Sequence, residues 1–143
     1  MAGYATNLRN ARQDAITTFA GNAALLRAYD GTRPATGGAA TTKLAEWTLG
    51  TPFAPAAAGG VLSPTLPADV VGLADGTVTW FRIVKSDGVT HVMDLGSGEV
   101  TVNTTTIQTG APCKVLGFTI TEGNPLWLSP TSNRTRLPTS PGR

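Results

Sequence analysis

The stretch that decides the fold is Thr77–Leu95, which reads TVTWFRIVKSDGVTHVMDL. Side chains alternate between two faces along Thr77–Lys85 and again along Val89–Leu95, and a period of two residues is the signature of a β-strand. Ser86-Asp87-Gly88, between the two runs, is a tight-turn sequence. We therefore predict an antiparallel hairpin here, and the assignment of the rest of the chain works outward from it.

Further strands are expected on both sides of this hairpin. The chain contains 17 glycines and 10 prolines and is rich in threonine, a mixture typical of many short strands joined by turns. The candidate strands are Leu25–Tyr29, Lys43–Leu49, Glu99–Asn103 and Cys113–Thr121, with an edge strand or wide turn around Ile107. The pattern predicts an all-β protein, an antiparallel β-sandwich or jelly-roll-like domain with one N-terminal helix and an extended C-terminal arm.

The N-terminal helix is predicted from apolar residues at three- and four-residue spacing. It should end at Gly21-Asn22. The apolar stripe comprises Tyr4, Leu8, Ala11, Ala15, Ile16 and Phe19, and the opposite side carries Asn7, Arg9, Asn10, Arg12, Gln13 and Asp14. Two interpretations stay open: the stripe packs on its own domain, or it docks on a neighbouring subunit.

Two proline-rich segments are unusually apolar. Residues 50–67 carry four prolines and no charge, so we expect no central strand there. This segment lies either over the core of its own chain or on a partner. Residues 123–143 carry four more prolines together with Leu126-Trp127-Leu128, which indicates an arm that orders on another chain. The expected organisation is an N-terminal helix or arm at 1–22, a β-sandwich at 23–122 and an extended arm at 123–143.

Composition narrows the classes of function. Charged residues make up 14% of the chain and the net charge is +2, so we expect no nucleic-acid partner. No stretch is long and apolar enough to predict a membrane-spanning helix. One cysteine cannot form an internal disulfide or a cysteine-based metal site.

The titratable residues do not form a catalytic pattern. His91 has no second histidine or cysteine nearby, and Cys113 has no neighbouring base. Among the carboxylates Asp69, Asp75, Asp87 and Asp94, two precede glycine in turn sequences. We therefore expect neither an enzyme nor a bound cofactor or metal.

Three segments carry a resemblance to a known group of proteins. Tyr29-Asp30-Gly31-Thr32, Trp80-Phe81-Arg82-Ile83 and Asn103-Thr104-Thr105 are its most specific parts, within about residues 7–124. The chain resembles small proteins encoded among the structural genes of tailed bacteriophages. The resemblance implies a virion protein that is assembled in the host cytoplasm.

Three hypotheses on function follow. The first is a capsid decoration or cement protein that ties neighbouring capsid subunits together, with the major capsid protein, other virion proteins or further copies of itself as partners. The second is a neck, collar or tail adaptor protein. The third, from another class, is a carbohydrate-binding module for host-surface glycans, for which only Trp127 would be free, because Trp47 and Trp80 fit core positions of strands. The residues expected to contact a partner are Leu8, Ile16, Phe53, Leu62, Leu126, Trp127, Leu128, Arg134 and Arg136.

Overall fold

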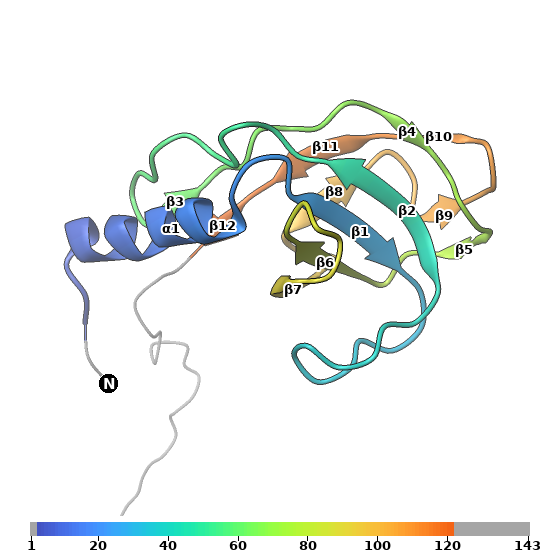
Figure 1. Cartoon of the computed structure of the whole chain (residues 1–143), viewed down its shortest axis with the longest axis horizontal. Helices are drawn as coiled ribbons and strands as arrows, with labels where there is room; N and C mark the ends of the chain where they lie inside the picture. The colour runs from blue at the N-terminus through green and yellow to red at the C-terminus, as the bar shows by residue number, and fades with distance from the viewer. Residues whose placement is uncertain (1–2, 122–143) are drawn as a thin grey trace, which may run out of the picture.

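A computed structural model describes residues 3–121, which form one N-terminal helix followed by short strands (Figure 1). The helix is α1 (Thr6–Ala20), and it ends as expected at Gly21, whose backbone N–H donates to the Thr17 carbonyl. The strands are β1 (Leu25–Tyr29), β2 (Lys43–Thr48), β3 (Val61–Leu62), β4 (Val70–Val71), β5 (Gly76–Thr77), β6 (Trp80–Val84), β7 (His91–Gly96), β8 (Val100–Val102), β9 (Thr106–Ile107), β10 (Pro112–Cys113), β11 (Val115–Phe118) and β12 (Ile120–Thr121).

The largest sheet is a four-stranded antiparallel sheet with the order β2-β1-β6-β7. The predicted hairpin is its β6–β7 half, and the pairing runs from Trp80 opposite Gly96 to Val84 opposite His91. Asp87 organises the turn because its carboxylate accepts hydrogen bonds from the backbone N–H groups of Val89 and Thr90. The hairpin prediction is confirmed.

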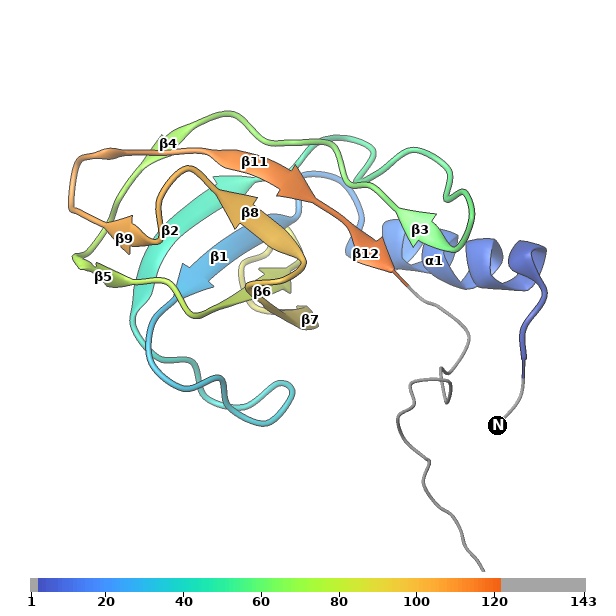
Figure 2. The same cartoon turned by 180° about the vertical axis from the view of Figure 1, so that it is seen from behind.

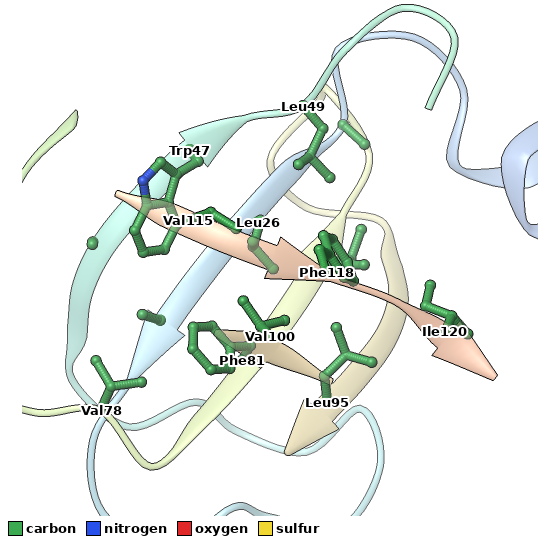
Figure 3. Packing of buried hydrophobic residues seen from close by; sticks show 14 of the residues in the cluster. Leu26, Trp47, Leu49, Val78, Phe81, Leu95, Val100, Val115, Phe118 and Ile120 are labelled. Atoms are coloured by element: carbon green, nitrogen blue, oxygen red, sulfur yellow. The ribbon is translucent and has the colours of Figure 1, made fainter. Parts of the chain in front are cut away.

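The other strands pair in four short two-stranded antiparallel sheets, β10-β4, β11-β8, β12-β3 and β5-β9. β8 and β11 cross over one face of the four-stranded sheet, and buried side chains lie between the two layers (Figure 3). Seen from the other side, β4 and β11 lie along the edge of the molecule opposite the 30–42 loop (Figure 2). The protein is therefore β-rich, with several antiparallel sheets that do not close on one another and one N-terminal helix.

The core lies between the four-stranded sheet and the strands that cross it. Aromatic side chains make specific contacts within it. The rings of Phe53 and Phe118 meet edge to face with centroids 6.3 Å apart, and the Trp47 indole N–H donates to the Cys113 carbonyl at 3.2 Å. The buried cluster includes Leu26, Trp47, Phe81, Ile83, Leu95, Val100, Val115 and Phe118.

The proline-rich segment 50–67 belongs to this core. Phe53 and Leu62 are completely buried within their own chain, so the expectation that they contact a partner is corrected. The segment also contains β3, a strand that the proline pattern did not predict. Its two residues lie between Pro55 and Pro64 and pair with β12 at the end of the described chain.

Trp80 lies on the opposite face of the four-stranded sheet from the core. Its indole N–H donates to the Asp30 carbonyl at 3.0 Å and to the Thr41 hydroxyl at 3.1 Å, and its ring stacks on Tyr29 with centroids 4.5 Å apart. The loop between β1 and β2 therefore buries a residue that the alternation had placed in the main core.

Candidate functional site

Helix α1 packs on its own domain through its polar side. The Asn10 side-chain oxygen accepts a hydrogen bond from the Gly60 N–H, and the Asp14 carboxylate accepts one from the Ala57 N–H, both at 2.8 Å. Between them, Gln13 is only 2% exposed. Of the two open interpretations, the one in which the apolar stripe packs on its own domain is therefore wrong for most of the stripe, because Asn10, Gln13 and Asp14 face the domain instead.

The reason lies in the 57–60 loop that precedes β3. Ala58 and Val61 bond to each other through both backbone pairs, and Gly59 and Gly60 adopt positive φ angles in the turn between them. The N–H groups of Ala57 and Gly60 then point toward the helix, where burial without an acceptor would cost about 1–3 kcal/mol each. Short polar side chains on the helix supply the acceptors, and the apolar stripe is left on the outside.

The outer helix face is the surface formed by Tyr4, Leu8, Ala11, Ala15 and Phe19. Leu8 is 48% exposed and Phe19 is 50% exposed, and both alanines are exposed. Ile16, which the sequence had placed on the same stripe, is half-buried and packs against the core. The face therefore presents large apolar side chains at each end and small ones in the middle.

Two cations border the outer helix face. The Arg12 guanidinium carbon lies 4.9 Å from the centroid of the Tyr4 ring, and the Lys85 ammonium nitrogen lies 4.3 Å from the centroid of the Phe19 ring. A surface of this kind suits an apolar, aromatic-bearing protein segment, because aromatic rings pack on aliphatic side chains and accept cations on their faces.

The structure brings together only some of the residues that were expected to contact a partner. Leu8 lies on the outer helix face and Ile16 at its border, whereas Phe53 and Leu62 lie in the core. Leu126, Trp127, Leu128, Arg134 and Arg136 lie outside the described residues. Tyr4 and Phe19 were missing from the predicted contacts, although their helical spacing to Leu8 already placed them on its face.

A charged cluster on the outer side of the four-stranded sheet has a structural role. The Asp94 carboxylate accepts hydrogen bonds from Arg82 Nε at 2.6 Å, from the Gly37 N–H at 3.0 Å and, at 3.0 Å, it contacts Nε2 of His91. Arg82 also donates to the Gly38 carbonyl. The cluster therefore clamps the loop between β1 and β2 onto the sheet.

These contacts decide the charge state of Asp94. Burial raises its pKa, but the hydrogen bonds from Arg82, Gly37 and His91 outweigh burial and lower the pKa to about 2. Because its side chain is 3% exposed and each oxygen already has partners, the carboxylate is not placed to act as a general acid or base.

The other residues that could act in catalysis or metal binding also make contacts within the fold. Asp75 accepts hydrogen bonds from the Thr109 N–H and hydroxyl, and Asp87 caps the hairpin turn. Cys113 is buried, and burial raises the pKa of its thiol. Within residues 3–121 there is no group of three or more His, Cys, Asp or Glu side chains placed to hold a metal, and no pocket.

No helix in the described part of the chain is both long and apolar enough to cross a membrane.

Comparisons with protein-family models, with curated proteins and with solved structures found no match to this chain.

Proposed function

We propose that this chain is a non-enzymatic structural protein of a tailed-phage virion, and that it attaches to neighbouring virion proteins through the outer helix face. Capsid decoration, in which the protein cements adjacent capsid subunits, is the form of this function that we favour. The proposal includes assembly in the host cytoplasm and a body of the β-sandwich or jelly-roll-like type, for which the crossing of β8 and β11 over the four-stranded sheet is the support.

The single observation that carries the proposal is the outward apolar stripe of α1. A helix on a free-standing domain normally buries its apolar side and exposes its polar side. Here the polar side makes the intramolecular contacts, and Leu8 and Phe19 remain half exposed. Burying a Leu or Phe side chain fully is worth roughly 1.5–3 kcal/mol, so covering this face by a partner would favour association.

A charge introduced at Leu8 tests this proposal. Leu8→Asp places a carboxylate on the outer helix face without disturbing the core, so the purified variant should melt within about 2 °C of wild type, as expected for a change of about 0.5 kcal/mol or less. In particles assembled with the variant in place of the wild-type chain, the amount of the protein on purified virions should fall at least tenfold.

Val89→Asp is the matched control. Val89 is 82% exposed in the β6–β7 hairpin, so it receives the same change of an exposed apolar residue to Asp on a different element. This variant should be incorporated like wild type. Normal incorporation of Leu8→Asp would contradict the proposal. The location of the wild-type protein on the virion separates the two forms of the function: many copies over the shell indicate capsid decoration, and a ring at one vertex indicates a neck or collar position.

Within the described residues, no tryptophan offers a platform for a sugar, because Trp47 and Trp80 are buried. The carbohydrate-binding alternative therefore depends entirely on Trp127, which lies outside them.

A further inference from the structure

The described chain ends close to the helix that carries the exposed stripe. β12 pairs with β3, and β3 is the strand on which α1 packs (Figures 1 and 2). After Thr121 the sequence continues with Glu-Gly-Asn and then Pro125-Leu126-Trp127-Leu128. An apolar sequence thus begins a few residues from the helix on which Leu8 and Phe19 are half exposed.

The size of the outer helix face matches a short segment better than a second folded body. α1 has 15 residues and is therefore about 22 Å long. A stable interface between two folded proteins usually buries about 800 Å² on each partner, more than one face of a helix this short is expected to supply. Four extended residues span about 13–14 Å, which fits along the face.

The chemistry of the face also fits Leu-Trp-Leu. Ala11 and Ala15 leave room in the middle, where an indole ring can lie between Leu8 and Phe19. Trp is the side chain most enriched at interface hot spots, and residues 125–128 carry no charge that the bordering Arg12 and Lys85 would repel.

The path length favours a segment from another copy. The strands that end the described chain lie on the inner side of α1, and half the circumference of a helix with its side chains is roughly 16–19 Å. β12 lies a further strand spacing, about 4.8 Å, from β3. Six residues from Thr121 to Trp127 extend to about 20–22 Å at most, so the indole of the same chain would reach its own outer helix face only with the segment fully extended.

We propose that the outer helix face binds Leu126–Leu128 of a second copy of this chain, so that copies link by exchanging their C-terminal segments. This inference rests on the proposed function and names the partner at the same site. Each link would join one copy's segment to another copy's helix, so that reciprocal exchange closes a dimer and head-to-tail exchange generates a ring or an extended array.

Cross-linking of full-length chains tests the exchange. One copy carries Ala11→Cys and a size tag, and an untagged copy carries Ser129→Cys, which leaves Leu126–Leu128 intact. The two are mixed and treated with a short flexible bismaleimide, while the native Cys113 is shielded by burial. We expect a heterodimer whose yield falls at least fivefold when Trp127→Ala is added to the Ser129→Cys chain. Gly98→Cys, at an open turn position, replaces Ala11→Cys as the control and should give no such product.

Four outcomes would overturn the exchange. A homodimer formed by Ala11→Cys alone would mean that two helices pair with each other. An intrachain link in the Ala11→Cys/Ser129→Cys double variant, with no heterodimer in the mixture at any concentration, would place the segment on its own helix. Absence of any link, or a heterodimer insensitive to Trp127→Ala, would remove Leu126–Leu128 as the occupant.

Attachment of the Leu8→Asp variant to virions tests the proposed function independently of the cross-link. If the cross-link fails while Leu8→Asp still prevents attachment to virions, the outer helix face binds a different virion protein and only the exchange is wrong. If the cross-link forms and Leu8→Asp virions retain the protein normally, the self-contact exists but does not mediate attachment.

Discussion

At the scale of single residues, Asp94 shows how hydrogen bonds stabilise a charged side chain that is 3% exposed in a β-rich domain. Its carboxylate accepts hydrogen bonds from the Arg82 guanidinium and the Gly37 backbone N–H, and it contacts the His91 ring. If one member of such a buried ion pair is removed, the remaining charge is left buried without its partner. This loss destabilises the fold more than replacing both charges by apolar residues does. The cluster therefore ties the loop between β1 and β2 to β6 and β7.

The low pKa of Asp94 predicts a pH dependence of stability. Because the folded-state pKa is about 2 and the ordinary value is 3.8, the carboxylate stabilises the fold above about pH 4, and this stabilisation is lost as the pH falls through 2. Asp94→Asn should lower the free energy of unfolding at pH 5 by about 2 kcal/mol or more and should flatten its fall between pH 4 and pH 2. Urea unfolding at several pH values in this range measures the free energy of unfolding and its change with pH. If Asp94→Asn leaves the pH dependence unchanged, another group is responsible for it.

Gly72 is a second position where one residue decides local packing. Its N–H donates to the Ala111 carbonyl and its carbonyl accepts from the Gly110 N–H, which draws the two segments together. A Cβ atom at this position would lie 2.3 Å from the Gln108 carbonyl oxygen.

We therefore expect Gly72→Ala to destabilise the protein by about 1–3 kcal/mol through overpacking. Gly98→Ala, where an added Cβ meets no atom within 4 Å, is the control and should be close to neutral. Thermal melting compares the two, and equal melting temperatures would show that the 108–111 backbone yields without penalty.

At the scale of elements, α1 is placed by its polar residues. Asn10 and Asp14 bind the backbone of the 57–60 loop, and this arrangement turns Leu8 and Phe19 outward. The loop and the helix therefore depend on each other, since side chains of the helix accept the hydrogen bonds of the Ala57 and Gly60 N–H groups.

Asp14→Ala tests this dependence. It leaves the Ala57 N–H without its acceptor and should lower the free energy of unfolding by about 1–3 kcal/mol. Asn7→Ala, at an exposed position of the same helix, is the control and should change stability by less than about 0.5 kcal/mol. A loss equally small for Asp14→Ala would mean that the helix is held mainly by Ile16 and Ala20.

At the scale of the whole molecule, the segment 50–67 joins the helix, β3 and the main core into one unit. Phe53 contacts Phe118 inside the core, while β3 pairs with β12 and packs on α1. The proline-rich segment is thus part of the folded body.

Phe53→Ala should therefore destabilise the isolated protein by about 3–5 kcal/mol, because it removes a fully buried ring and leaves a cavity. Leu66→Ala, a truncation of a half-exposed residue on the same segment, should cost less than about 1 kcal/mol. Chemical denaturation of both variants gives the comparison. A small loss for Phe53→Ala would show that the segment is not required by the core.

Much of the strand pattern follows from sequence alone, because it depends on neighbours along the chain. The alternation in Thr77–Leu95 and the turn at Asp87-Gly88 specify the hairpin, and Leu25–Tyr29 is recovered with its observed ends. α1 and its end at Gly21 are likewise local, since helical spacing and a glycine stop need no tertiary contact.

What only the tertiary structure decided is which side of each element is buried. Helical spacing divides α1 into an apolar and a polar side, but the backbone N–H groups of a loop more than forty residues away determine that the polar side faces inward. In the same way, Trp80 is buried by the loop between β1 and β2, and Phe53 by Phe118. These partners are distant in sequence. Local patterns therefore predict which residues form the apolar stripe, whereas only the folded chain shows that Leu8 and Phe19 on it stay half exposed.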